Sequence, residues 1–212
     1  MRERGQFITF EGIDGSGKTT QMRLLGERLR AEGRDVFETA EPGGTEVGRQ
    51  IRRILLDSAN QDLRPTTELL LYFASRAQNV EQSILPALTA GKVVLADRFT
   101  DSTLAYQGYA RGLGTETVLT LDRIACQGLV PDLTLLIDLD LDTGIARTRV
   151  RNAAGATSET RLDEESAEFH RKVREAYLTI ARQHADRFRI VDGRESPKDV
   201  AAAVWREVVA HV

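Results

Sequence analysis

The stretch FEGIDGSGKTT, residues Phe10 to Thr20, decides which fold this sequence can adopt. It contains the pattern Gly-x-x-x-x-Gly-Lys-Thr, follows a short apolar run and opens an amphipathic one. This order predicts a strand, a glycine-rich turn and a helix. In such a turn the backbone N–H groups converge at the N-terminus of the helix, where the positive end of the helix dipole lies. The stretch therefore predicts an anion-binding loop in an α/β fold.

The residue types in this loop match a site for a nucleoside triphosphate. Lys18 is expected to bridge the terminal phosphates, and the Thr19 hydroxyl is expected to bind Mg²⁺. The predicted ATP-binding residues are Gly12, Ile13, Asp14, Gly15, Ser16, Gly17, Lys18, Thr19 and Thr20. The alternative is a glycine-rich turn with a surface lysine, which the strand before it and the helix after it make less attractive. GTPases, ATPases and small-molecule kinases share the loop, so the loop alone does not name the reaction.

Asp14 is the unusual residue of the loop, because a carboxylate close to bound phosphates costs free energy. If its side chain points away from ATP, it can accept a hydrogen bond from a sugar hydroxyl of a second substrate. The sequence has no Asn-Lys-x-Asp element for guanine, and 212 residues are few for a motor or transporter ATPase. These features favour a small-molecule kinase.

The composition sets outer limits on the function. A chain of 212 residues, 41% hydrophobic and 29% charged, suits one domain spanning residues 1–212. A net charge of −3 argues against broad binding to nucleic acid or anionic membranes. The single Cys126 excludes an intramolecular disulfide, and neither a signal-peptide pattern nor a run of 18 apolar residues occurs. We expect a cytoplasmic protein with no nucleic-acid or membrane partner.

Short apolar runs alternate with longer amphipathic runs along the chain. Runs too apolar to leave one face in water predict a parallel sheet with helices on both faces, a three-layer α/β fold that binds ligands beyond the C-terminal strand ends. The predicted strands span residues 7–10, 36–39, 93–96, 133–138 and 188–192. The predicted helices span residues 18–32, 65–90, 115–127, 142–152, 163–185 and 197–210, with a further helix start near residue 49. Residues 152–160 are small and polar and predict a mobile loop.

Charged side chains follow the second and third predicted strands. Asp97 is expected to reach the Mg²⁺ sphere, and Arg98 to pair with an acceptor phosphate, the alternative being a surface ion pair. Arg52 follows the turn Pro-Gly-Gly and is a candidate phosphate contact. Tyr72 and Arg76 stand four residues apart on a predicted helix, a spacing that lets a ring stack on a base while the guanidinium bonds its edge. Core packing with a solvated arginine is the alternative there.

A basic segment at about residues 147–163 is a lid candidate. Arg149, Arg151 and Arg161 could fold over the transferring phosphoryl group and stabilise its transition state. The alternative is a solvated, charged helix face.

Six motifs occur in one order: GIDGSGKTT, EPGGT, YFASRAQ, DRF followed by STLAYQG, PDLTLLIDL, and RTRVR with RLDEE. Together they resemble bacterial thymidylate kinase over nearly the whole chain. The resemblance implies a P-loop nucleoside monophosphate kinase fold, with a five-stranded parallel sheet flanked by helices, a lid, and a homodimer. It implies transfer of the γ-phosphoryl group of Mg-ATP to dTMP in dTTP biosynthesis. A deoxynucleoside kinase and a non-catalytic nucleotide-binding module are the alternatives.

The resemblance also implies roles for single residues. Asp14 would bind the 3′-hydroxyl of dTMP, Arg98 its phosphate, and Tyr106 would crowd the ribose 2′ position. Gly15 and Ser16 leave no arginine in the loop, which resembles the lid-arginine type. The implied catalytic residues are Lys18, Arg98, Arg149, Arg151 and Arg161, and the implied metal ligands are Thr19 and Asp97. The implied substrate-binding residues are Asp14, Arg52, Tyr72, Phe73, Arg76, Arg98, Thr103, Tyr106 and Gln107.

Overall fold

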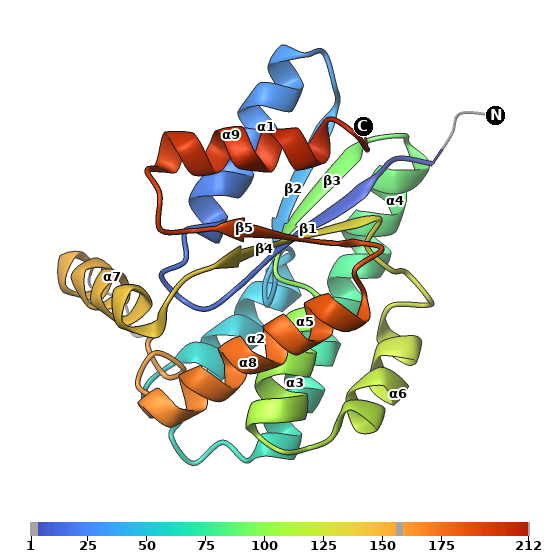
Figure 1. The fold of residues 1–212 in the computed structure, drawn as a ribbon. Helices are drawn as coiled ribbons and strands as arrows, with labels where there is room; N and C mark the ends of the chain where they lie inside the picture. Colours follow the sequence, from blue (N-terminus) through green and yellow to red (C-terminus); the bar gives the residue numbers. More distant parts are fainter. Residues whose placement is uncertain (1–3, 156–158, 212) are drawn as a thin grey trace.

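A sheet of five parallel strands lies at the centre of the structure (Figure 1). The computed structural model describes residues 4–155 and 159–211, and of residues 151 and 154 only the backbone. The strands are β1 (Phe7–Glu11), β2 (Val36–Ala40), β3 (Val93–Asp97), β4 (Leu133–Asp138) and β5 (Phe188–Asp192), in the spatial order β2-β3-β1-β4-β5. Each predicted strand is confirmed, with ends that differ by at most one residue.

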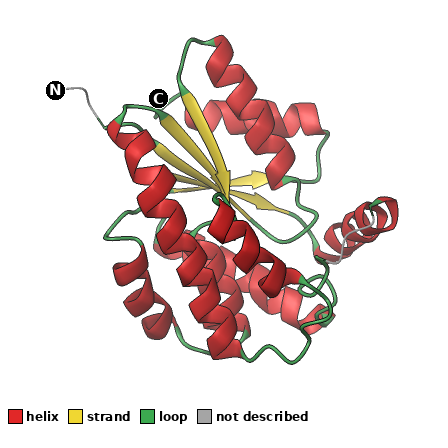
Figure 2. Cartoon of the chain, turned by 180° about the vertical axis from the view of Figure 1, so that it is seen from behind, coloured by secondary structure: helices red, strands yellow, loops and turns green. Residues whose placement is uncertain are grey.

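Helices cover both faces of this sheet (Figures 1 and 2). Helices α1 (Lys18–Ala31) and α9 (Pro197–Val208) lie on one face. The other face carries α3 (Pro65–Asn79), α4 (Leu85–Thr89), α5 (Thr100–Thr103), η2 (Leu104–Ala110), α6 (Thr115–Ala125) and α8 (Ala167–Gln183). Helix α2 (Glu46–Leu56) packs beside α3, and α7 (Leu141–Ala154) projects from the body of the molecule. Among the residues described, no helix is both long and apolar enough to cross a bilayer.

Alternate residues of β1 face the two helix layers. Ile8 and Phe10 pack in a core cluster with Leu25 of α1 and Val204 of α9. Phe7 lies in the second cluster, on the opposite face. Because both faces of the sheet are buried, the strands are almost uniformly apolar, which is why their positions could be predicted.

The helices differ from the sequence prediction in several places. The helix predicted at residues 65–90 is interrupted by the π-helical segment η1 (Val80–Ile84), which separates α3 from α4. Helix α8 begins at Ala167 rather than residue 163, because Ser166 caps it and accepts a hydrogen bond from the N–H of Phe169. No helix is predicted for α5 and η2; residues 100–108 are all buried, so the polar face that marks an amphipathic helix is missing.

Helix α7 rests directly on the loop between β1 and α1. A Cβ atom added to Gly15, whose φ is +77°, would lie 2.3 Å from the carbonyl oxygen of Gly144 in α7. Only two glycines allow backbones to approach this closely. The helix also extends two residues beyond its predicted end, into the segment predicted as a mobile loop, of which residues 156–158 lie outside the described residues.

Candidate active site

The loop between β1 and α1 lines a cavity of about 550 Å³ at the C-terminal edge of the sheet. Residues 14–20 contribute to its wall. The Lys18 ammonium group is 6% exposed and donates a hydrogen bond of 2.8 Å to the carbonyl oxygen of Ile13. Burial, together with the nearby Arg98 guanidinium, lowers the pKa of Lys18 to about 8. The lysine is thus held at the mouth of the loop as a cation with few partners, as a phosphate contact requires.

Thr19 and Asp97 meet at the edge of the same cavity. The Thr19 hydroxyl donates a hydrogen bond of 2.5 Å to Oδ2 of Asp97, which ends β3. A hydroxyl and a carboxylate oxygen are the hard ligands that Mg²⁺ prefers when phosphates and waters complete its octahedron. The two residues fit the predicted metal site.

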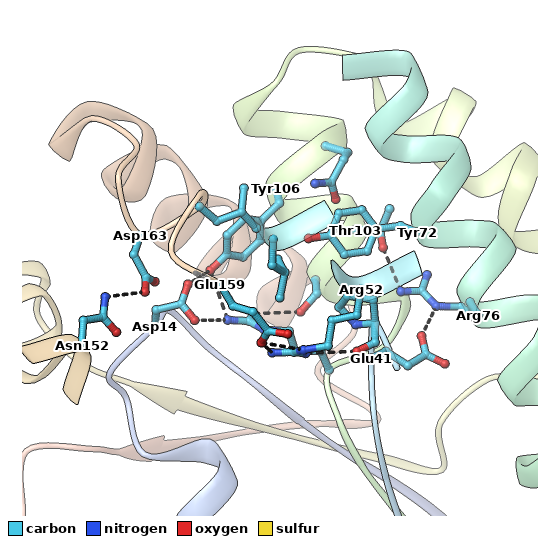
Figure 3. Close-up of a pocket in the computed structure, with 16 residues that line it drawn as sticks. Asp14, Glu41, Arg52, Tyr72, Arg76, Thr103, Tyr106, Asn152, Glu159 and Asp163 are labelled. Carbon is cyan, nitrogen blue, oxygen red and sulfur yellow. Dashed lines mark hydrogen bonds and ion pairs between the residues drawn. The ribbon is translucent and has the colours of Figure 1, made fainter. Parts of the chain in front are cut away.

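A second cavity of about 300 Å³ adjoins the first (Figure 3). Asp14, Glu41, Arg52 and Arg98 line both cavities. The wall of the second cavity comes from the loops after β1, β2 and β3, from α2, α3, α5 and η2, and from the end of α7 and the segment after it. Two compartments that share one wall suit a reaction between two bound molecules.

Arg98 and Asp14 form an ion pair in this shared wall. Nη2 of Arg98 lies 2.7 Å from Oδ1 of Asp14, and the Tyr106 hydroxyl donates a 2.9 Å hydrogen bond to Oδ2. Burial by itself raises the pKa of Asp14, but Arg98, Lys18 and the Tyr106 hydrogen bond outweigh it and hold that pKa far below its usual value. Asp14 is therefore a carboxylate at neutral pH, and Arg98 compensates the charge that is unusual in a phosphate loop.

Arg76 lies at the far end of the second cavity and is 1% exposed. Its Nε donates to Glu41 at 2.5 Å, and its Nη2 donates to the Thr103 hydroxyl at 2.9 Å and to the carbonyl oxygen of Phe99 at 3.0 Å. Its Nη1 is buried and has no hydrogen-bond partner among the described residues. These contacts and its burial fix the Arg76 guanidinium at this end of the cavity.

Tyr72 and Gln107, which were predicted to contact the base, both line the same cavity. The Gln107 amide donates a 2.8 Å hydrogen bond to Glu68. Phe73 is placed differently from the prediction: it lies in the hydrophobic core and does not line the cavity. Its ring stands 5.1 Å from the Arg76 guanidinium carbon, so it supports Arg76 from behind.

Of the predicted lid arginines with described side chains, neither Arg149 nor Arg161 lines the cavity at the phosphate loop. Arg149 is exposed on α7 and lines a separate cavity, and Arg151 lies outside the described side chains. Arg161 is 4% exposed, donates to the carbonyl oxygen of Leu55, and lies 2.6 Å from Glu68. This placement corrects the expectation that Arg161 is a free lid arginine: its guanidinium is already bound to a buried carboxylate. Among the described side chains of this segment, that of Arg147 lines the first cavity.

Arg52 lines both cavities, as a phosphate contact should. Its Nε donates to Glu159 at 2.9 Å and its Nη1 to the carbonyl oxygen of Pro42 at 3.0 Å. Sequence reasoning missed the acidic partners Glu41 and Glu68, and also Glu11 and Tyr177, which lie behind Arg98. Glu11 could have been noticed in the sequence, because it is an acid at the end of an apolar strand, directly before Gly12. Tyr177 could not, because it is spaced along α8 like an ordinary core residue.

The fold, the anion-binding loop and the adjoining second cavity define a P-loop kinase of the nucleoside monophosphate class. A family model described as "Thymidylate kinase" matches residues 10–204. The thymidylate kinase of Pelobacter propionicus is 52% identical over 207 residues, which cover 97% of this chain and 94% of that one. That of Caldanaerobacter subterraneus is 51% identical over 205 residues, which cover 97% and 95%. The crystal structure of thymidylate kinase from Ehrlichia chaffeensis superposes with a TM-score of 0.79 at 32% identity, covering 97% and 99% of the two chains. This chain belongs to the thymidylate kinase family.

Proposed function

We infer that this protein transfers the γ-phosphoryl group of ATP to dTMP and releases dTDP and ADP. The observation that carries this function is the arrangement of the two cavities around one ion pair. ATP phosphates fit the cavity at Lys18, and a nucleoside monophosphate fits the cavity that runs from Arg98 to Arg76. The two reacting groups then meet in the shared wall, which supplies the proximity on which phosphoryl transfer depends.

Opposite ends of the second cavity suit opposite ends of dTMP. The Arg98 guanidinium contacts the phosphate loop at Gly12 and Asp14 and is assigned to the acceptor phosphate. Arg76, which lines the cavity, is assigned to a carbonyl oxygen on the edge of thymine, with Tyr72 as the stacking ring and Thr103 and Gln107 in the base pocket. An arginine thus binds each end of dTMP: Arg76 the hydrogen-bonding edge of the base, and Arg98 the phosphate.

The sugar lies between these ends. Asp14 is assigned to the 3′-hydroxyl, because its carboxylate stays ionised and can accept a charge-assisted hydrogen bond. The Tyr106 ring stands beside Arg98, and its hydroxyl is fixed by Asp14. We assign to it the exclusion of a 2′-hydroxyl.

Catalysis in this site consists of positioning and charge stabilisation. The acceptor is a phosphate oxygen that is already ionised near neutral pH, so no general base is needed. Lys18 contacts the transferring group, and Thr19 and Asp97 would hold a Mg²⁺ that neutralises phosphate charge. Arg149 and Arg151 remain candidates for the lid contact, and Arg147 joins them through its place in the first cavity.

The main rival is a deoxynucleoside kinase, whose acceptor hydroxyl must lose a proton to a base. Asp14 is the carboxylate of the phosphate loop, and its strongly lowered pKa makes it a weak base. The rival of another class, a binding module without turnover, does not account for Lys18, Thr19 and Asp97 at one cavity. A single domain with a lid at about residues 147–163, a homodimer, a cytoplasmic location and a place in dTTP biosynthesis stay predictions from the resemblance.

The test is an ADP-release assay with Mg-ATP and one acceptor at a time. We expect turnover with dTMP, very little with thymidine, and background with no acceptor, and dTDP should accumulate in step with ADP. Preferred turnover of thymidine would establish the deoxynucleoside kinase instead, and tight nucleotide binding without ADP release would establish the binding module. Arg76→Met serves as the matched variant, because it should lower kcat/KM for dTMP while leaving the KM for ATP unchanged.

A further inference from the structure

The guanidinium of Arg98 is held on both sides. On the cavity side, Nη2 lies 2.7 Å from Asp14 and 3.3 Å from the Tyr106 hydroxyl. On the core side, Nη1 donates to three acceptors: the carbonyl oxygen of Gly12 at 3.2 Å, the Ser102 hydroxyl at 3.0 Å and the Tyr177 hydroxyl at 3.1 Å. The side chain is therefore fixed at both terminal nitrogens.

The carboxylate of Glu11 lies behind the two hydroxyls. It is 0% exposed and accepts hydrogen bonds from the Phe99 N–H at 2.8 Å, the Ser102 hydroxyl at 2.6 Å and the Tyr177 hydroxyl at 2.9 Å. Glu11 does not line either of the two cavities. A carboxylate in this position serves the core side of Arg98 without touching a substrate.

Arg98 fixes the direction of its own hydrogen bonds to these two hydroxyls, because a guanidinium can only donate. A hydroxyl has one proton, and an ionised carboxylate can only accept. The Ser102 and Tyr177 hydroxyls both lie within hydrogen-bonding distance of Oε2 of Glu11 and 2.7 Å from each other, and both oxygens accept from Nη1 of Arg98. Burial, together with the Asp101 carboxylate, raises the pKa of Glu11 to about 7, so the acid is only partly ionised at neutral pH and its charge is costly in this core position.

Arg98 has a particular need for such support. Its backbone has a φ of +72°, an uncommon conformation for a residue other than glycine. The strand end thus places the side chain in a strained turn, and its partners must determine where the guanidinium points.

We propose that Tyr177 is a positioning residue for the reaction: its hydroxyl, oriented by Glu11, holds the Arg98 guanidinium at the place where the acceptor phosphate binds. This proposal rests on the proposed function, in which Arg98 binds the phosphate of dTMP. Tyr177 lies on α8, which follows the lid segment in the chain and packs against η2. The helix thereby takes part in acceptor binding without contributing a residue to the cavity wall.

The competing explanation is that Tyr177 only fills space. Its side chain is 1% exposed, and its ring packs edge-on against Tyr106 at 6.3 Å. Tyr177→Phe separates the two roles, because it keeps the ring and removes only the hydroxyl. Glu11 and Arg98 each retain their other partners in that variant, so the fold should tolerate it.

The experiment measures dissociation constants for dTMP, thymidine and ATP by calorimetry, with unfolding temperature as a fold control. Losing one hydrogen bond to a charged group should weaken dTMP binding by about fivefold to twentyfold. Thymidine has no phosphate, so its affinity should change less than about twofold, as should that of ATP. Tyr109→Phe is the matched control, because Tyr109 is 39% exposed and should leave all three constants unchanged.

Arg98→Ala distinguishes failure of this proposal from failure of the proposed function. In the Arg98→Ala background, adding Tyr177→Phe should weaken dTMP binding no further. If Arg98→Ala alone spares dTMP binding, the phosphate assignment of Arg98 falls and this proposal falls with it. If Arg98→Ala weakens dTMP binding but Tyr177→Phe leaves it unchanged, or weakens thymidine equally, the positioning role of Tyr177 is overturned and the proposed function stands.

Discussion

Replacing Asp14 by asparagine tests the most unusual feature of the phosphate loop. The change keeps the size of the side chain and removes its charge. In the structure this carboxylate accepts two hydrogen bonds, from Arg98 at 2.7 Å and from the Tyr106 hydroxyl at 2.9 Å, and its side chain is 24% exposed. The amide oxygen of the introduced asparagine can still accept a hydrogen bond, but it no longer neutralises Arg98.

The magnitude follows from converting a charge-assisted hydrogen bond into a neutral one in a partly exposed site. We expect a loss of roughly 1 to 3 kcal/mol of transition-state stabilisation, which is about ten- to a hundredfold in kcat/KM for dTMP. An ion pair fully exposed to water would contribute about 1 kcal/mol or less, so a larger loss indicates a role in the site.

The loss has two sources, which an analogue separates. Asp14 orients Arg98, which affects every acceptor with a phosphate, and it is assigned to the 3′-hydroxyl, which affects only acceptors that carry one. With 3′-deoxy-dTMP, Asp14→Asn should therefore cost only about two- to fivefold. Asp62→Asn, at an exposed position, is the control for general effects of the substitution.

The assay is steady-state ADP release with both acceptors and both proteins, with thermal unfolding to monitor the fold. Equal losses for dTMP and its 3′-deoxy analogue would refute the sugar contact and leave Asp14 with a role in orienting Arg98 alone. Unchanged kcat/KM for both acceptors would refute the whole argument and reduce Asp14 to a turn residue.

Three further predictions concern other parts of the site. The pKa of Lys18 is lowered to about 8, so its positive charge is present well below that pH and is lost as the pH rises through it. The dissociation constant for ATP, titrated from pH 6.5 to 9.5, should therefore be flat at first and rise above about pH 8. A flat curve throughout would contradict this. Glu68→Gln removes the carboxylate shared by Arg111 and Arg161, so the free energy of unfolding, measured in urea, should fall by about 3 to 5 kcal/mol. A loss below about 1 kcal/mol would show that other groups compensate the two buried arginines. Gly15→Ala places a Cβ 2.3 Å from the Gly144 carbonyl oxygen, at a residue whose φ is +77°. Because this clash should displace helix α7, kcat should fall at least about tenfold. Near-normal turnover would show that α7 does not rest on the loop during the reaction.

The sequence by itself determined the order of the elements and the phosphate loop. Strands buried on both faces are apolar throughout, and a glycine-rich turn before a helix has a fixed spacing, so both features can be recognised from neighbouring residues alone. Lys18, Thr19 and Asp97 could be assigned in this way because each lies in or directly beside such a pattern. Residues 100–108 could not, since a helical segment buried on all sides loses the periodicity that would reveal it.

Only the tertiary structure decided which charges meet. The pairing of β1 with β3 and the packing of α8 bring Arg98 to Asp14 and Tyr177 to Glu11, across 84 and 166 residues of chain. Arg161 also shows that neighbouring residues do not reveal the partner of a charge. Its sequence context suggested a lid arginine, whereas in the structure the carboxylate of Glu68, 93 residues away, binds it in the interior. A charged side chain takes the partner that compensates the loss of its hydration, and the fold determines which partner lies within reach.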